Sequence, residues 1–556
     1  RIRFITKARR SSSANATLGL RGLIPPAYLT MEQQLHKIMA TVRALGDDLA
    51  KHVFLQDLND RNATLFHRTL VRHTEELAPL VYTPTVGKAC QLFATTYRRP
   101  RGMYFTANDV GHMAAMTMNW PAKSVSVIVV TDGSRVLGLG DLGASSMGIP
   151  VGKLALYCAA GGIAPHRVLP VVLDVGTNNQ ELLDDPFYLG LRRPRLKGDE
   201  YFAVVDEFVK AVVHRWPGVL IQFEDFSSDV AQAILARYRH NTLCFNDDVQ
   251  GTGATVVAGA FASLRQLGYQ NAVEALPDKR IVVCGAGSAG IGVATALRDA
   301  AARARHRSGE PTETDLAEAA KKIYVLDADG LVVRDDHVFG AAFDVPGVQR
   351  GDSLLSVIER VKPTMLLGLT AVPNLFTEQV VRSFKANCPD SKPILMPLSN
   401  PTSCAECTAE DAYAWTGGDV IFASGSPFAP VRVSGKLLTP SQANNMFLFP
   451  GVGLGATVAK SAVVSDAMFY AAAQACADSL TDDELHRGQV FASVSRIRSV
   501  SRNVAVAVLR SAIADGLCRV PDQDLPSSSD DQKLHAFVDR KMYYPYYVPL
   551  ISNPYA

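Results

Sequence analysis

Acidic side chains follow two apolar segments of this 556-residue chain, where they could bind a metal ion. These acids are Glu224 and Asp225 after residues 219–223, and Asp247 and Asp248 after residues 243–245. If both segments are strands of an open α/β sheet, the acids lie at the sheet edge where such folds bind ligands. Gathered carboxylates repel one another unless a cation neutralises them, and oxygen ligands favour Mg²⁺ or Mn²⁺ over Zn²⁺. The alternative is that each acid pair caps a helix or faces solvent.

A glycine-rich segment, Gly285-Ala-Gly287-Ser-Ala-Gly290, follows the apolar segment Arg280–Cys284 and precedes a run of small residues. In dinucleotide-binding folds the first glycine permits a tight turn, the second lets the pyrophosphate approach, and the third lets the helix pack closely. The next predicted strand ends in Asp327, an acid suited to ribose hydroxyls. We therefore predict a dinucleotide site, the alternative being a glycine-rich turn without a ligand.

A second segment with the same glycine spacing is Gly138-Leu-Gly140-Asp141-Leu-Gly143. Residues 127–137 before it contain Thr-Asp-Gly-Ser between two apolar pieces, which predicts a hairpin rather than a strand followed by a helix. Asp141 would also place a negative charge where a phosphate would bind. We therefore predict that this segment holds the backbone near the substrate pocket and is not the main cofactor site.

The elements that must position these residues are short apolar strands that alternate with helices. The predicted strands are 124–130, 168–173, 219–223, 243–245, 280–284, 323–326, 364–369, 394–398 and 420–423. Uniformly apolar strands between helices indicate parallel sheets covered on both faces. Helical spacing dominates residues 32–80 and 252–267, whereas residues 301–320 are predicted to be an insertion or exposed loop. The predicted fold class is α/β with several domains.

Composition restricts the class of protein. A chain of this length needs more than one core. Its 56 basic and 54 acidic residues leave a charge of +2, which gives no reason to expect a nucleic-acid partner. Its apolar segments are too short to cross a membrane. Nine scattered cysteines suit a reducing compartment. Six basic residues and no acid precede Glu32, so the expected location is cytoplasmic or, if this stretch is a transit peptide, mitochondrial.

Nine segments resemble, in order, the characteristic segments of malic enzymes, which oxidatively decarboxylate L-malate to pyruvate and carbon dioxide. They are TLGLRGLIPP (17–26), VYTPTVG (81–87), RVLGLGDLG (135–143), GIPVGKLALY (148–157), IQFEDF (221–226), FNDDVQGTGA (245–254), LSNPT (398–402), FASGSPF (422–428) and QANNMFLFPG (442–451). The resemblance implies a helical N-terminal region (1–75), a parallel-sheet substrate and metal domain (76–255), a Rossmann-type dinucleotide-binding domain (256–525) and a tail (526–556). It also implies a homotetramer built as a dimer of dimers.

The resemblance assigns roles to individual residues. The implied metal ligands are Glu224, Asp225 and Asp248; the implied catalytic residues are Tyr82 as general acid and Lys153 as general base, with Asp247 beside it; the implied substrate-binding residues are Arg135, Asn400 and Asn444; the implied dinucleotide-binding residues are Gly285, Gly287, Ser288, Ala289, Gly290, Asp327 and Asn400.

The reaction explains these residue types. Malate must lose its hydroxyl proton and a hydride from C2, and then carbon dioxide from C3. A divalent cation polarises the hydroxyl and stabilises the later enolate. Lys153 accepts the proton only when it is uncharged part of the time, which burial favours and Asp247 opposes. Tyr82 can supply the proton that C3 needs, and Arg135 can bind a carboxylate through two hydrogen bonds.

The cofactor is predicted to be NADP, with NAD as the alternative. Asp327 alone favours NAD, because its charge repels a 2′-phosphate. Basic residues that could offset this charge are Arg334, His337 and Arg350 after Asp327, and Arg303, Arg305, His306 and Arg307 after the glycine-rich segment, unless they are solvated surface charges. The competing functions are another two-domain oxidoreductase, such as an amino-acid dehydrogenase, which needs no acid cluster, and a non-catalytic binding protein on this fold.

Overall fold

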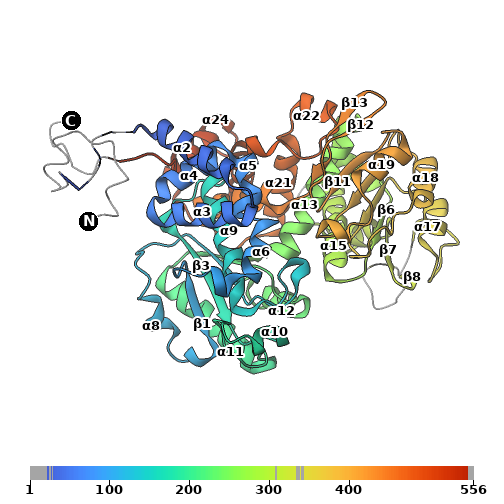
Figure 1. The fold of residues 1–556 in the computed structure, drawn as a ribbon. Coiled ribbons are helices and arrows are strands. Elements are labelled where there is room, and N and C mark those ends of the chain that lie inside the picture. Colours follow the sequence, from blue (N-terminus) through green and yellow to red (C-terminus); the bar gives the residue numbers. More distant parts are fainter. Residues whose placement is uncertain are drawn as a thin grey trace. The chain divides into compact units, whose positions relative to one another are not determined.

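The computed structural model describes residues 22–23, 25, 27, 29–306, 310–332, 339 and 343–548. The chain forms two compact units: the first comprises Arg1–Ile221 and Asp539–Ala556, and the second comprises Gln222–Val538. Figure 1 labels their helices and strands. Among the described residues, no helix is long and apolar enough to cross a membrane.

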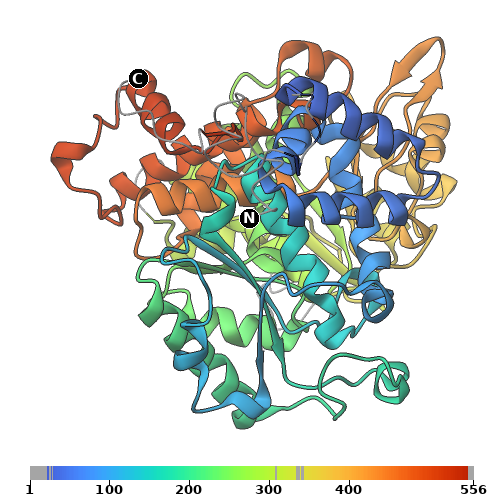
Figure 2. The ribbon, with the colours of Figure 1, turned by 60° about the vertical axis from the view of Figure 1, so that its left-hand side comes forward.

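The first unit begins with helices, as predicted for residues 32–80. They are α2 (Met31–Ala44), α3 (Asp48–Arg61), α4 (Ala63–Arg72), α5 (Thr74–Val81), α6 (Thr85–Gln91) and α7 (Phe93–Thr96). The side chains of Thr30, Asp47 and Asn62 accept backbone N–H bonds at the N-termini of α2, α3 and α4, which satisfies donors that a helix start leaves unpaired. The apolar faces of α2–α5, blue in Figure 2, pack together and against α9 (Gly148–Ala159).

A parallel sheet forms the rest of the first unit. Its strands lie in the order β1 (Met103–Thr106), β3 (Val168–Asp174) and β2 (Val127–Thr131), and the other helices are α8 (Met113–Thr117), α10 (Gln180–Asp184) and α11 (Gly198–Arg215). β2 is buried along its whole length, which explains its uniformly apolar sequence, and α9 packs against β2 and β3. The next strand, β4 (Leu220–Phe223), contains the division between the units.

The second unit contains a seven-stranded sheet in the order β14-β11-β10-β9-β6-β7-β8. The strands are β6 (Ile281–Cys284), β7 (Ile323–Asp327), β8 (Gly330–Leu331), β9 (Met365–Gly368), β10 (Ile394–Pro397), β11 (Ile421–Ser424) and β14 (Ser441–Gln442). All pairings are parallel except that of β7 with β8. The chain passes from β6 to β7 on one side and returns to β9 on the other, so the strand order reverses between β6 and β9, the position at which open α/β sheets bind ligands.

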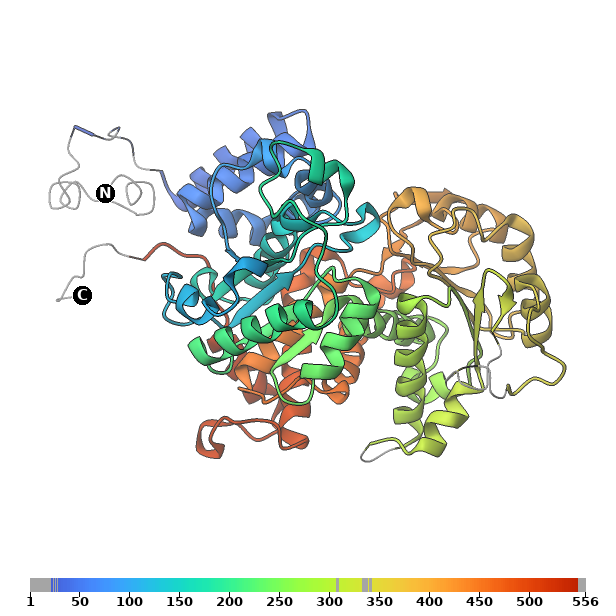
Figure 3. The ribbon, with the colours of Figure 1, turned by 90° about the horizontal axis from the view of Figure 1, so that it is seen from below.

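Helices cover both faces of this sheet (Figure 3). The helices of the second unit are α12 (Ser228–Tyr238), α13 (Thr252–Gln266), α14 (Ala272–Ala275), α15 (Ser288–Arg305), α16 (Glu313–Ala320), α17 (Leu354–Val361), α18 (Glu378–Asn387), α19 (Ala409–Thr416), α20 (Phe449–Val458), α21 (Asp466–Asp478), α22 (Asp482–His486), α23 (Ile497–Ala514) and most of α24 (Asp531–Lys541), whose residues from Asp539 onward belong to the first unit. Alternate strand residues such as Val282 and Leu366 pack against α17–α19, and α15 packs against β6 and β7. A separate pair, β12 (Val431–Val433) and β13 (Lys436–Leu438), forms an antiparallel ribbon.

All nine predicted strands are present, and two other expectations were wrong. The hairpin expected in residues 127–137 is not formed, because β2 ends at Thr131 and Leu137–Leu139 form a 3₁₀ turn. Most of residues 301–320 is helical rather than a loop, because α15 extends to Arg305 and a capping box at Thr312 starts α16. Five further strands, β1, β8, β12, β13 and β14, were not predicted, and each is only two to four residues long.

Candidate active site

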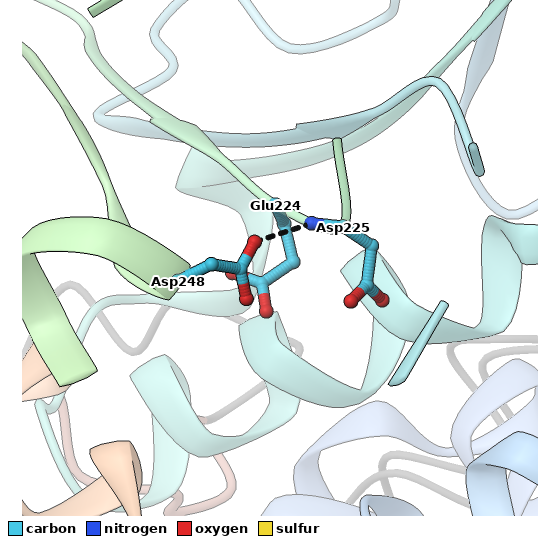
Figure 4. A group of neighbouring side chains, drawn as sticks. All are labelled: Glu224, Asp225 and Asp248. Carbon is cyan, nitrogen blue, oxygen red and sulfur yellow. Dashed lines mark hydrogen bonds between the residues drawn. The ribbon is translucent and has the colours of Figure 1, made fainter. Parts of the chain in front are cut away.

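Three carboxylates gather in the second unit at the ends of two strands (Figure 4). Glu224 and Asp225 follow β4, and Asp248 follows β5 (Cys244–Asn246). One carboxylate oxygen from each lies within 4.8 Å of the others, and Glu224 and Asp225 are each only 3% exposed. Three like charges so close, two of them almost fully buried, fit a hard divalent cation, which would neutralise them and prefer oxygen ligands.

Local backbone structure fixes these acids. Asp225 has a φ of 56°, a left-handed conformation that is uncommon outside glycine, and its N–H donates to Asp248 Oδ2 at 2.7 Å. Asp248 lies in a single π-helical turn, Asp247–Gly251, whose start is capped by the side chain of Asn246. Such turns recur at functional sites because they redirect side chains. The left-handed residue and the π-turn together aim carboxylates from different strands at one point.

Asp247, the predicted neighbour of the general base, is fully buried. Asn445 Nδ2 donates to its Oδ2 at 3.3 Å and to its backbone oxygen at 3.1 Å. A Cβ atom at Gly251 would lie 1.9 Å from Asp247 Oδ1, so only glycine leaves room for the carboxylate. Asn445 was not identified from the sequence, which predicted a substrate-binding role for its neighbour Asn444. The side chain of Asn444 caps the following 3₁₀ turn by accepting from Met446 N–H.

The predicted acid and base, Tyr82 and Lys153, lie close together in the first unit. Tyr82 ends α5 and is 7% exposed, and Lys153 lies on α9 and is 1% exposed. Lys153 Nζ is 5.9 Å from the centroid of the Tyr82 ring. A Cβ atom at Gly152 would lie 2.6 Å from the backbone oxygen of Val81, so glycine is needed for α9 to approach the end of α5 this closely. The structure therefore places the Lys153 ammonium group beside the Tyr82 ring.

Arg135, the predicted carboxylate ligand, is exposed on the segment after β2. This segment is held by Arg195, which the sequence did not reveal: Arg195 Nε and Nη2 donate to the two oxygens of Asp141 at 3.0 and 2.6 Å, and its Nη1 donates to the backbone oxygen of Asp132 at 2.9 Å. Burial opposes the charge of Arg195, but the carboxylates of Asp132 and Asp141 hold its pKa above the usual value. Asp141 thus has a structural partner, in agreement with a backbone-holding role for the second glycine segment.

The predicted dinucleotide turn connects β6 to α15. Gly285 has a φ of 119°, and a Cβ atom there would lie 2.5 Å from the backbone oxygen of Leu369. A Cβ atom at Gly290 would lie 1.7 Å from the backbone oxygen of Gly285, so the helix packs on the turn as predicted. At Gly287, by contrast, a Cβ atom would meet no protein atom within 4 Å. That space beside the N-terminus of an 18-residue helix suits a pyrophosphate, as the fingerprint requires.

Of the remaining predicted ligands of the dinucleotide, two begin α15 and two lie at other strand ends of the same sheet. Ser288, whose Oγ donates to Ser228 Oγ, and Ala289 begin α15. Asp327 is exposed at the end of β7, and its Oδ1 accepts from Asp329 N–H. Asn400 follows β10, where its Oδ1 accepts from Ser426 Oγ at 2.8 Å.

Of the basic residues considered for NADP, three contact other protein groups, one is exposed, and three lie outside the described residues. Arg303 forms an ion pair with Glu310, His306 lies 3.2 Å from Asp315, and Arg305 donates to the backbone oxygen of Pro277. Arg350 is exposed. Arg307, Arg334 and His337 lie outside the described residues.

Two family descriptions together match most of the chain. Residues 59–239 match the family description "Malic enzyme, N-terminal domain", and residues 249–513 match "Malic enzyme, NAD binding domain". The chain belongs to the malic enzyme family. This confirms the family and the α/β fold class expected from the sequence.

Relatives within the malic enzyme family are similar over nearly the whole chain. The NAD-dependent malic enzyme 59 kDa isoform, mitochondrial, of Solanum tuberosum is 44% identical over 96% of this chain and 91% of its own length. The NADP-dependent malic enzyme of Dictyostelium discoideum is 42% identical over 95% of this chain and 94% of its own. The crystal structure of the Entamoeba histolytica malic enzyme, at 20% identity, covers 94% of this chain and 90% of its own with a TM-score of 0.55, which shows a shared fold.

Proposed function

We propose that this malic enzyme converts L-malate to pyruvate and carbon dioxide with reduction of NAD, and that it needs Mn²⁺ or Mg²⁺. The observation that carries this proposal is the convergence of Glu224, Asp225 and Asp248 in a chain that also has a glycine turn of the dinucleotide-binding kind. Family membership and the names of the relatives support the substrate and the redox cofactor. An amino-acid dehydrogenase would not need this acid cluster.

In the proposed mechanism, Glu224, Asp225 and Asp248 hold the cation. When bound, the cation supplies polarisation of the malate hydroxyl and stabilisation of negative charge on the same oxygen after carbon dioxide leaves. Asp247 is kept in one orientation by Asn445 and Gly251.

Lys153 takes the hydroxyl proton in this proposal, and Tyr82 later donates a proton to C3 of the enol form of pyruvate. The position of Lys153 beside the Tyr82 ring supports this division of roles, because a proton lost by the phenol can be replaced from a neighbouring ammonium group. Burial of both side chains keeps water from competing for these protons. Arg135 is proposed to bind a carboxylate of malate, and the amides of Asn400 and Asn444 are proposed to contact the substrate and the nicotinamide.

NAD is proposed in place of the NADP expected from the sequence, which the comparisons do not confirm. Asp327 presents an exposed carboxylate at the end of β7, where it suits two ribose hydroxyls and repels a 2′-phosphate. Three of the basic residues that were expected to offset its charge have protein partners. The Solanum and Arabidopsis relatives are named as NAD-dependent.

The test is malate-dependent reduction of NAD and NADP, measured in parallel with Mn²⁺ present or chelated. We expect turnover only with metal and a kcat/KM ratio of NADP to NAD well below one. Asp327→Ser should raise this ratio by at least about tenfold, because one charge–phosphate repulsion is removed. A metal-independent rate would contradict the metal site, and a wild-type ratio above one would contradict the choice of NAD. An absence of turnover under all conditions would instead support a non-catalytic binding protein.

The assembly, compartment and domain division remain proposals. The family resemblance supports a homotetramer. The basic, serine-containing N-terminal stretch and the mitochondrial relatives favour a mitochondrial over a cytoplasmic location. The four-part division at residues 75, 255 and 525 is to be tested by limited proteolysis.

A further inference from the structure

One buried carboxylate of the second unit has no part in the proposed chemistry. Glu406 lies between β10 and α19 and is fully buried. Among the described residues it forms no ion pair, and its charge is compensated by hydrogen bonds alone. A buried charge lowers the stability of the folded protein unless such bonds are complete, so an apolar residue would be more favourable if only packing were required here. Its position therefore points to a specific role.

The hydrogen bonds of Glu406 join two loops. Its Oε1 accepts from Thr370 N–H at 2.9 Å and Thr370 Oγ1 at 3.0 Å, in the loop after β9. The same oxygen accepts from Ser399 Oγ at 2.5 Å, and Oε2 lies 3.4 Å from Ser399 N, in the loop after β10. Ser399 Oγ in turn accepts from Ala371 N–H at 2.8 Å. One carboxylate thus fixes the ends of two neighbouring strands.

The backbone around Glu406 is built for this contact. A Cβ atom at Gly368 would lie 2.5 Å from Glu406 Cδ, so a side chain at that position would displace the carboxylate. Ala371 has a φ of 55°, a left-handed conformation that costs free energy for a residue with a Cβ atom. It is retained because the Ser399 hydroxyl accepts its N–H. The hydrogen bonds therefore hold the loop after β9 in a conformation that would be unfavourable without them.

Both loops adjoin the dinucleotide site. Gly285, the first glycine of the turn, packs directly on the backbone of Leu369 and Thr370. Ser399 immediately precedes Asn400, the predicted nicotinamide contact. We propose that Glu406 is a positioning residue, which holds the loops after β9 and β10 against the dinucleotide and is itself remote from the reacting atoms. This proposal rests on the proposed dinucleotide site.

The test uses the full chain and NADH as the probe, with binding measured by NADH fluorescence in the absence of malate. Glu406→Ala leaves four donors without this acceptor, and we expect the Kd for NADH to rise about tenfold or more. Glu406→Gln keeps one acceptor oxygen, so its Kd for NADH should rise only about two- to threefold. Glu410→Ala removes an exposed carboxylate four residues later and should match the wild type.

Steady-state kinetics separate positioning from a general loss of stability. We expect Glu406→Ala to raise KM for NAD more than KM for malate. If Glu406→Ala fails to fold, Ser399→Ala provides the same test, because it removes only the hydroxyl that links Glu406 to Ala371, and it should raise the Kd for NADH. A variant that melts at a lower temperature but binds NADH as the wild type does would overturn the proposal. Wild-type protein that binds NADH without oxidising malate would refute the proposed reaction while leaving this binding test intact.

Discussion

Asp248→Asn is expected to change stability in opposite directions with and without metal. One oxygen each of Glu224, Asp225 and Asp248 lies within 4.8 Å of the others. At that distance and an effective dielectric constant of about 20, two unit charges repel by about 3.5 kcal/mol. The substitution removes two of three such pairs. Because Asp248 is half-buried and solvent screens it, we expect a net gain of about 1–3 kcal/mol in the unfolding free energy of the metal-free protein.

The metal-bound protein should respond in the other direction. Asparagine keeps an oxygen that can accept from the Asp225 N–H, so the loop should keep its conformation. It lacks the charge that binds a cation, and the loss of one of three carboxylate ligands should weaken Mn²⁺ binding by at least about a hundredfold, or about 2.7 kcal/mol. Activity at limiting Mn²⁺ should then be abolished.

Thermal unfolding in chelator and in a series of Mn²⁺ concentrations measures both effects. In chelator the variant should melt a few degrees above the wild type, and its melting temperature should no longer rise with Mn²⁺. Asp229→Asn, which removes an exposed carboxylate on α12, is the matched control and should show neither effect. The reasoning is refuted if Asp248→Asn melts below the wild type in chelator, or if Mn²⁺ raises the melting temperatures of both proteins equally.

Three further predictions follow from other sites. Gly287→Ala should leave the melting temperature unchanged but raise the Kd for NADH about tenfold, because its Cβ enters open space, whereas Gly290→Ala should lower the melting temperature through a backbone clash. Arg195→Lys should lower the unfolding free energy by about 2–4 kcal/mol in urea titrations, because lysine cannot form both bonds to Asp141. Burial lowers the pKa of His67 to about 3, so between about pH 6.5 and pH 5 this histidine takes up a proton in the unfolded chain but not in the folded one. The unfolding free energy should therefore fall by up to about 1.4 kcal/mol per pH unit as the pH is lowered from 6.5 to 5. His67→Phe should remove this contribution to the pH dependence.

Local patterns were enough to predict nine of the strands, the glycine turn and the acids that gather at two strand ends. Uniform burial of a strand such as β2 produces an apolar sequence, and a turn such as that at Gly285 needs glycine whatever lies around it. The contacts that hold the site depend on residues distant in the sequence. Asn445 lies 198 residues from Asp247, and Arg195 lies 54 residues from Asp141. Their pairing follows from tertiary structure, which neither spacing nor composition encodes.

Topology explains why Glu406 can serve two loops. In a parallel sheet, β6, β9 and β10 end at the same edge, so the loops that follow them lie side by side although β6 ends at Cys284 and β10 at Pro397. A carboxylate just after β10 therefore reaches the loop after β9, which in turn contacts the glycine turn after β6. The loop after β9 borders the point between β6 and β9 where the strand order reverses, and at such a point neighbouring loops diverge and leave space for a ligand. The dinucleotide site and its proposed support are thus consequences of the same strand order.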